Sequence, residues 1–141
     1  MKKVFLGGTC AESKWREDLI KLLKINYYNP VVEDWTPDCM TEEIKQRESC
    51  DYCLYVITPR MIGVYSIAEV IDDSNKRPTK TVFCFLETDT NPIQNSTSMP
   101  VDKLKFNTAQ IKSLNQVGNM VFHNGGNYLK SLEGVADFLN Q

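Results

Sequence analysis

The feature that most constrains the fold is a set of short apolar runs, each about as long as one strand, separated by segments with helical spacing. The clearest run spans residues 51–58 and is apolar nearly throughout. Such a run is typical of a strand covered on both faces, so we expect it to lie at the centre of a parallel sheet. Four similar runs occupy residues 4–6, 30–32, 81–86 and 119–122. The sequence therefore predicts five strands.

Helices are expected between these strands. Residues 12–25 place Trp15 and Leu19 on one helical face, and Thr41 is expected to cap a helix that ends near Ser49. The other expected helices cover residues 65–74, 103–116 and 128–139, and residues 88–100 are expected to form a long polar loop that could serve as a lid. Alternating strands and helices predict parallel pairing through right-handed crossovers. The expected fold is an α/β, flavodoxin-like (doubly wound) three-layer sandwich with a five-stranded, mainly parallel sheet.

The length and charge of the chain limit its function. With 141 residues, we expect one domain that spans residues 1–141. Sixteen Lys and Arg face eighteen Asp and Glu, for a net charge of −2, so we expect no binding to nucleic acid or to an anionic membrane. No apolar run approaches the roughly 20 residues that span a bilayer, and the first apolar stretch is too short for a signal peptide. We expect a cytoplasmic protein.

The five cysteines do not indicate a metal or disulfide site. Their number is odd and their spacing follows no regular framework. Cys50 and Cys53 form a CxxC pair, but a zinc site would need a second pair or two histidines, and His123 is the sole histidine. The pair also lies where a helix gives way to a strand, whereas a redox pair belongs at the start of a helix. We expect ordinary thiols and no metal.

Residues able to bind a ligand are expected at one edge of the sheet. In doubly wound sheets, ligands bind at the carboxyl ends of the strands, beside the point where the strand order reverses. Gly63 in this region would allow close approach of a ligand. Ser66 and Glu69 follow it three residues apart, on one helical face. Glu69 either forms a capping box with Ser66 or faces the ligand, and spacing alone leaves both interpretations open.

The residues around Glu69 resemble those of a known enzyme family. The blocks at residues 4–9, 29–35 and 50–73 are similar to the nucleoside 2-deoxyribosyltransferase family, particularly its small, compact branch. The likeness covers roughly the first 90 residues. Its pattern is a strand, a loop with Pro and Gly, and a helix that carries a glutamate, which Gly63 and Glu69 match. The resemblance implies cleavage of an N-glycosidic bond and transfer of a 2-deoxyribosyl group between nucleobases through a covalent intermediate on Glu69.

The resemblance also implies a second acid, and the sequence departs from the family at one point. Some transferases carry an Asp six residues before the nucleophile, where this chain has Gly63. A further family acid lies on the helix before the central strand. Glu43 fits its spacing better than Glu42 or Glu48, although three acids on one helix also suit a solvated face. No cofactor is expected, because a carboxylate alone can stabilise and capture an oxocarbenium-like centre.

The remaining expected contacts lie at the same edge of the sheet, at the carboxyl ends of the expected strands. The expected substrate-binding residues are Gly7, Gly8, Thr9, Asp34, Trp35, Met61, Gly63, Tyr65 and Ser66. Trp35 either stacks on a base or covers the core, and Asp34 either bonds a base edge or caps a turn. The backbone amides of residues 7–9 could approach the sugar or a 5′-phosphate, and Met61 and Tyr65 could wall the pocket.

The expected partners are a small-molecule nucleoside or nucleotide and a free base. The resemblance further implies a homodimer or a higher homo-oligomer. Two other functions stay open: a deoxynucleoside or deoxynucleotide N-hydrolase, and a nucleotide- or NAD-derivative-binding module with little turnover.

Overall fold

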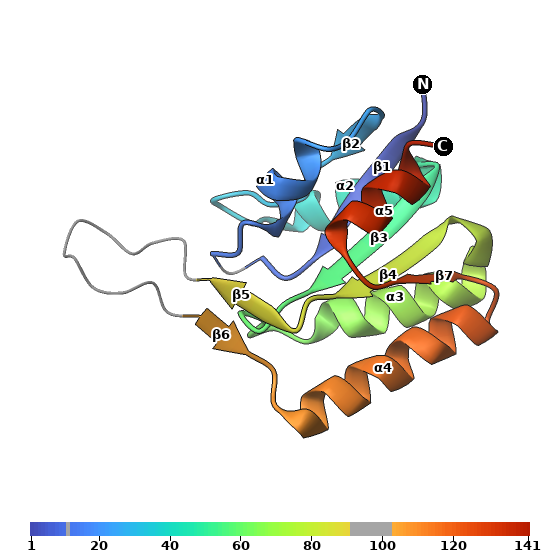
Figure 1. Cartoon of the computed structure of the whole chain (residues 1–141). Coiled ribbons are helices and arrows are strands. Elements are labelled where there is room, and N and C mark those ends of the chain that lie inside the picture. Colours follow the sequence, from blue (N-terminus) through green and yellow to red (C-terminus); the bar gives the residue numbers. More distant parts are fainter. Residues whose placement is uncertain (11, 91–102) are drawn as a thin grey trace.

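A five-stranded parallel sheet forms the centre of the molecule (Figure 1). The structure is a computed structural model that describes residues 1–10, 12–90 and 103–141. The strands among these residues are β1 (Lys3–Gly8), β2 (Asn26–Tyr28), β3 (Tyr52–Ile57), β4 (Thr81–Phe85), β5 (Thr88–Thr90), β6 (Lys103–Lys105) and β7 (Asn127–Leu129). The helices among them are α1 (Trp15–Ile20), α2 (Pro37–Ser49), α3 (Tyr65–Lys76), α4 (Thr108–His123) and α5 (Leu132–Leu139), with a 3-10 turn at Pro78–Lys80.

The order of the strands fixes where a ligand can bind. The sheet runs β2-β1-β3-β4-β7 and every neighbouring pair in it is parallel. β3 is the central strand, as predicted for the apolar run at 51–58. The chain leaves β1 for β2 on one side and returns to β3 on the other, so the order reverses between β1 and β3. Their carboxyl ends, Gly8 and Ile57, therefore lie at the expected binding edge.

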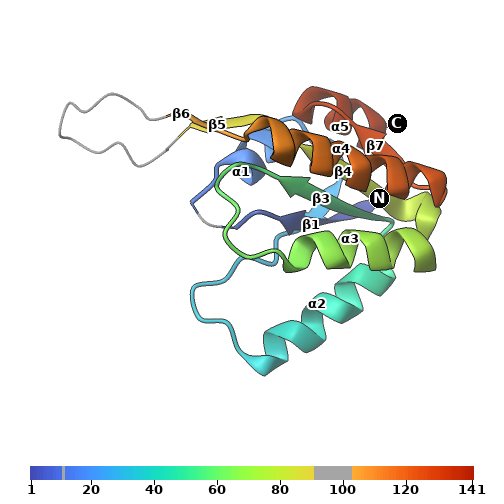
Figure 2. The same cartoon turned by 90° about the horizontal axis from the view of Figure 1, so that it is seen from below.

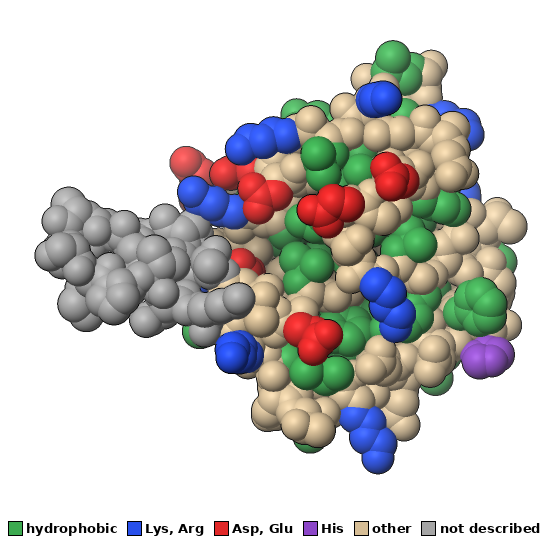
Figure 3. All heavy atoms as spheres, in the orientation of Figure 1, with side chains coloured by type: hydrophobic (Ala, Val, Ile, Leu, Met, Phe, Trp, Pro, Cys, Tyr) green, Lys and Arg blue, Asp and Glu red, His purple; other side chains and the backbone are tan. Residues whose placement is uncertain are grey.

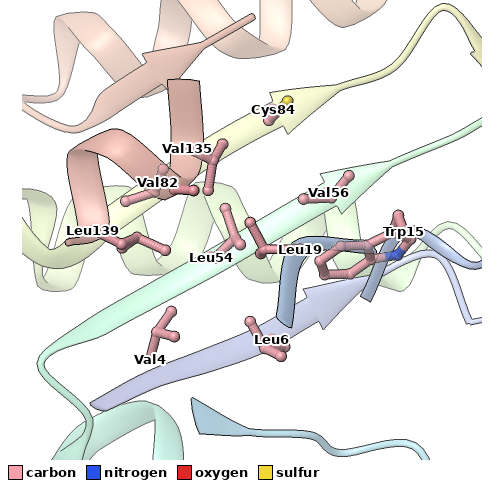
Figure 4. Packing of buried hydrophobic residues seen from close by; sticks show 11 residues of the cluster. Val4, Leu6, Trp15, Leu19, Leu54, Val56, Val82, Cys84, Val135 and Leu139 are labelled. Atoms are coloured by element: carbon pink, nitrogen blue, oxygen red, sulfur yellow. The ribbon is translucent and has the colours of Figure 1, made fainter. Parts of the chain in front are cut away.

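Helices cover both faces of the sheet and complete the three expected layers. On one face, Leu19 of α1 and Val135 and Leu139 of α5 pack on Leu54 and Val56 of the central strand (Figure 4). Each is fully buried. A buried side chain of this size contributes about 1.5–3 kcal/mol relative to an exposed one, so this layer is a substantial part of the core.

The opposite face carries α3 and α4. Val70 of α3 and Val121 of α4 pack with Tyr55 and Phe83 of the sheet. Figure 2 shows α2 beside α3, away from the sheet. Arg47 is the residue of α2 that is buried, and most of the other α2 side chains contact solvent. The position of α2 thus depends on polar contacts around Arg47 more than on an apolar face.

The second strand lies earlier in the chain than expected. Residues 30–32 are irregular, and β2 at Asn26–Tyr28 pairs with Lys3–Phe5 instead. Pro30 lacks an N–H and cannot donate to the ladder, whereas the aromatic residues before it favour a strand. The helix expected over residues 12–25 is shorter than predicted, because α1 covers only Trp15–Ile20.

The strand expected at residues 119–122 is wrong, because these residues form the last turns of α4. A capping box between Asn107 and Gln110 starts this helix, and the helical period then places Leu114 and Val121 in the core. The last strand is β7, which pairs with β4. Ser131 caps α5. This helix therefore begins at Leu132, four residues after the expected start at 128.

Two other boundaries also differ from the prediction. α2 begins at Pro37, with proline in the first helical turn, so Thr41 lies within the helix and does not cap it. Thr88–Thr90 is not loop: it pairs antiparallel with Lys103–Lys105, which was expected to be helical. The rest of the expected 88–100 loop, and its expected role as a lid, lies outside the described residues.

The surface shows no concentration of positive charge on the side seen in Figure 3. Lysine and arginine side chains there are interspersed with acidic and hydrophobic ones. None of the helices in the described ranges is both long and apolar enough to cross a bilayer.

Candidate active site

The end of β1 is shaped by two glycines with different packing roles. A Cβ at Gly7 would lie 2.6 Å from the ring of Tyr55, so the position needs the smallest residue. Gly8 has φ +118°, and a Cβ there would lie 2.0 Å from the carbonyl oxygen of Val56. Both glycines are therefore required by the close pairing of β1 and β3.

Thr9 joins the loops that follow β1 and β3. Its amide donates to the carbonyl of Val56 at 2.9 Å, and its Oγ1 accepts from the amide of Thr58 at 2.9 Å. Thr9 is buried, and its amide is engaged within the protein. Thr9 therefore holds the two loops together. Its amide, which was expected to bind a ligand, already donates to the Val56 carbonyl.

Two residues of α1 fix the loop after β1 through hydrogen bonds that the sequence did not indicate. Arg16 is buried and donates to the carbonyls of Leu6, at 3.0 Å, and Thr9, at 2.6 Å. Nε1 of Trp15 donates to the same Thr9 carbonyl at 2.8 Å. Burial lowers the pKa of Arg16. Because an arginine in the first turn of a helix is usually exposed, nothing in the sequence pattern marks this one as buried.

A first hollow of about 210 Å³ lies at this edge of the sheet. Its walls are Gly8, Thr9, Cys10, Met61, Ile62, Gly63, Tyr65 and Ser66. Six of the expected substrate-binding residues therefore meet in one place. A Cβ added at Gly63 would find no atom within 4 Å, so this glycine faces open space and is not required by packing.

A second hollow of about 330 Å³ lies between α2 and α3, and it contains Glu69. Its walls are Arg47, Tyr65, Ala68, Glu69 and Asp72. Tyr65 borders both hollows and is 66% exposed. Ser66 and Glu69, expected on a common face, line different hollows.

Glu69 does not act as a helix cap. α3 begins at Tyr65 after Val64, and that cap position has no side-chain hydrogen bond. The capping box with Ser66 therefore does not form. Instead, Oε2 of Glu69 lies 3.5 Å from Nη1 of Arg47, with 14% of the Glu69 side chain exposed. The carboxylate is largely buried, but the hollow can still admit a ligand to it.

The protein holds the Glu69 carboxyl near its titration point at neutral pH. Burial raises the pKa of Glu69 from 4.5 to about 7, Arg47 opposes this rise, and the negative charges of Glu43 and Asp73 add to it. A carboxylate with a raised pKa is more basic and hence a stronger nucleophile when it is ionised. Perturbation by burial and by a specific charged partner is typical of functional groups.

Arg47 is fixed by a buried carboxylate behind it. Its Nε and Nη2 donate to the two oxygens of Asp73, at 3.2 and 2.9 Å. The Asp73 side chain is completely buried and also pairs with Arg77 at 2.8 Å. Tyr55 donates its hydroxyl to Asp73 as well. Burial lowers the pKa of Arg47, but the bonds to Asp73 raise it overall, so the guanidinium stays charged.

Glu43 lies close enough to Glu69 to affect its pKa. Asp34 and Trp35, which precede α2, are exposed at the surface. Glu43 is half-buried, and burial raises its pKa, against the effects of Arg47 and of a hydrogen bond from the Trp35 side chain. Trp35 is 54% exposed, so it does not cover the core. Asp34 is exposed on the same loop, which joins β2 to α2, so neither residue stands at the end of a strand as expected. Glu43, Asp34 and Trp35 line neither of the two hollows, and Glu43 is linked to Glu69 through its electrostatic effect.

The described residues contain no group of three or more His, Cys, Asp and Glu that could hold a metal ion. Cys50 and Cys53 are buried free thiols, as expected. Burial raises the pKa of both, that of Cys53 to about 12. A thiol that stays protonated is a poor nucleophile, so this CxxC pair lacks the property that redox pairs share.

Comparison with known proteins adds one finding. Residues 1–87 match the family described as nucleoside 2-deoxyribosyltransferase like. No curated protein and no solved structure matches the chain. The matched part extends from β1 through β4, so it contains both hollows and every expected site residue.

Proposed function

The chain belongs to the nucleoside 2-deoxyribosyltransferase-like family, and we propose that it cleaves the N-glycosidic bond of a deoxynucleoside and transfers the 2-deoxyribosyl group to another nucleobase. The observation that carries this proposal is the Glu69 carboxyl. It is largely buried, borders a hollow, faces a fixed cation and has a pKa of about 7. These are the properties of a carboxylate suited to attack a sugar carbon.

The reaction proceeds in two displacements. The Glu69 carboxylate attacks C1′ while the bond from C1′ to the base nitrogen breaks, and the departing base keeps that electron pair and takes a proton from an acid. The product is a deoxyribosyl ester on Glu69. A nitrogen of the incoming base then attacks C1′, its proton passes to the carboxylate that the acid became in the first step, and the bond from C1′ to Glu69 breaks. Two inversions retain the configuration at C1′.

Glu43 is the proposed acid for the departing base. Its pKa is raised by burial, which favours the protonated form that a donor needs. It also influences the pKa of Glu69, so the two carboxyls act at one place and their charges oppose each other. The proposed step uses the ionised form of Glu69 and the protonated form of Glu43; burial raises the pKa of both, and their charges oppose each other.

The exposed aromatic residues complete the proposed substrate site. Trp35 contacts Glu43 and stays exposed, so a base could stack on its indole beside the acid. Tyr65 borders the two hollows and would contact the sugar. Met61 and Ser66 line the first hollow, which receives the part of the substrate remote from Glu69.

Gly63 gives a specific reason to consider hydrolysis as a second function. Because the space where its Cβ would stand is open, water can occupy a position that some relatives fill with Asp. If water attacks the ester instead of a base, the same site acts as a deoxynucleoside N-hydrolase. The chemistry on Glu69 is common to both functions, and the products distinguish them.

The test is chromatography of a deoxynucleoside incubated with a different free base. We expect exchanged nucleoside from the unmodified protein, and mainly free deoxyribose if it is a hydrolase. Glu69→Gln should reduce either activity by roughly a hundredfold, about 3 kcal/mol of transition-state stabilisation. Glu48→Gln, on the exposed side of α2, is the matched control and should leave activity unchanged. An undiminished rate in Glu69→Gln would refute the mechanism.

Assembly is a further part of the proposal. Apolar surface is exposed at Trp35, at Ile44 of α2 and at Tyr65, which borders the second hollow. We propose that a second copy of the chain covers this surface, so that the active form is a homodimer or a larger homo-oligomer.

A further inference from the structure

We propose that Arg47 is a positioning residue for Glu69, which it holds ionised and aimed into the second hollow while Asp73 holds Arg47 in place. The inference rests on the proposed function of Glu69 and adds to it the residue that controls that carboxylate. Arg47 lies on α2, one turn after Glu43, and its side chain is 11% exposed.

The N–H donors of Arg47 have two sets of partners: some bind Asp73, and Nη1 faces Glu69. Nε and Nη2 bind Asp73, and Nη2 also reaches Asp72 at 3.3 Å. Nη1 is left to face Glu69, at 3.5 Å. Among the described residues, no hydrogen bond ends on the Glu69 carboxylate. An ion pair at this distance favours the charged form, yet it leaves the lone pairs of Glu69 available to attack.

The anchor is stronger than the contact that it supports. Asp73 is completely buried and binds Arg47 through two parallel N–H···O bonds, the arrangement that a guanidinium makes best. Arg77 and Tyr55 supply further donors to Asp73. Arg47 therefore cannot rotate away from Glu69 without leaving a buried carboxylate partly unpaired, which is costly.

Arg47 is the cation among the groups that face Glu69. From α2 come Arg47 and Glu43; from α3 come Asp72 and Asp73; and β3 contributes the neutral hydroxyl of Tyr55. Burial and the acids favour a protonated Glu69, and Arg47 opposes them. The pKa of about 7 is the balance of these effects, so loss of Arg47 would leave Glu69 protonated at neutral pH and unable to attack.

A purely structural role makes a different prediction. If Arg47 only joined α2 to α3 through Asp73, its loss would lower activity equally at every pH. Arg77 provides the matched comparison, because it binds the same Asp73 oxygen as Arg47 but is not among the groups that shift Glu69. Arg47→Met and Arg77→Met each remove one partner of Asp73, and only the first removes the cation beside Glu69.

The decisive experiment is a carboxyl ¹³C NMR titration of Glu69, assigned from the signal that Glu69→Gln lacks, alongside the pH profile of kcat/KM. In Arg47→Met we expect the Glu69 midpoint and the acid limb of the profile to rise together by at least about one pH unit. Activity should fall roughly tenfold near neutrality and recover as the pH rises. Arg77→Met should leave both midpoints in place.

Two results would overturn the inference: a Glu69 midpoint that stays in place in Arg47→Met, or one that moves equally in Arg77→Met. If Arg47→Met does not fold, Arg47→Lys and Arg77→Lys form the same comparison, because a lysine cannot bind Asp73 by two bonds and still face Glu69. A shifted midpoint in a protein without glycosyl-transfer or hydrolase activity would support the control by Arg47 and refute the proposed function.

Discussion

Replacing Glu69 by glutamine should stabilise the folded protein above neutral pH, although it removes an ion pair. The folded state raises the pKa of this carboxyl from 4.5 to about 7, so between these values it binds the proton more tightly than the unfolded chain does. Stability falls with rising pH wherever the folded state holds more protons. Glu69 therefore destabilises the protein progressively from about pH 4.5 to about pH 7, and glutamine does not.

The magnitude follows from the size of the rise. A change from 4.5 to about 7, at about 1.4 kcal/mol for each pH unit, corresponds to about 3 kcal/mol. Solvent still reaches part of the carboxylate, so we expect about 2 kcal/mol after screening. The attraction of Arg47 is already contained in this net value, because it opposes the rise in pKa.

The assay is urea unfolding of the unmodified chain, Glu69→Gln and Glu48→Gln at about pH 5 and pH 8. At pH 8 the Glu69→Gln variant should be about 2 kcal/mol more stable than the unmodified protein, and at pH 5 the difference should fall to roughly 0.5 kcal/mol. Glu48→Gln, at an exposed position, should follow the unmodified protein at both values. Equal or lower stability of Glu69→Gln at pH 8 would show that Arg47 outweighs burial, and the reasoning on Glu69 would fail.

Three further predictions test the site and the assembly. Gly63→Asp has open space for its side chain, so unfolding free energy should change by only about 0.5 kcal/mol, and the ratio of exchanged nucleoside to free sugar should rise; a constant ratio would separate Gly63 from water access. Gly8→Ala would place its Cβ 2.0 Å from the Val56 carbonyl at a positive φ, so thermal unfolding should show a loss of at least about 3 kcal/mol, and a melting curve like that of the unmodified protein would contradict this packing. Sedimentation velocity should show a homo-oligomer that Trp35→Ser and Ile44→Ser weaken, and a monomer that is fully active at nanomolar concentration would refute the proposed assembly.

The centre of the sheet could be predicted because its signal is simple. A parallel strand at the centre is covered on both faces, so residues 51–58 are apolar without alternation. The edges were harder to predict. β2 has three residues that are mostly exposed, so no apolar run marks it. Residues 119–122 are apolar enough to suggest a strand, yet the capping box upstream at Asn107 commits them to α4.

The proposed nucleophile was easier to single out than the residues around it. The strand, loop and helix that precede Glu69 are visible in the sequence, and the family resemblance assigns the role to that position. Arg47 and Asp73 are 26 positions apart and belong to helices whose other polar residues are mainly solvated. A buried ion pair has no periodicity of its own, and it becomes apparent only when the packing of α2 beside α3 is known. The buried Arg16 was missed as well, because its partners are backbone carbonyls that only the folded loop brings together.

The carboxyl-terminal third of the chain lines neither the first nor the second hollow. Neither includes a residue beyond Asp72, although a further hollow of about 270 Å³ joins Met61 to residues of α4. α5 nevertheless supplies Val135 and Leu139 to the core that holds β3, and α4 packs on the face that carries α3. Family membership rests on residues 1–87, which include the proposed nucleophile and the proposed acid, whereas the later elements complete the sheet and bury its faces.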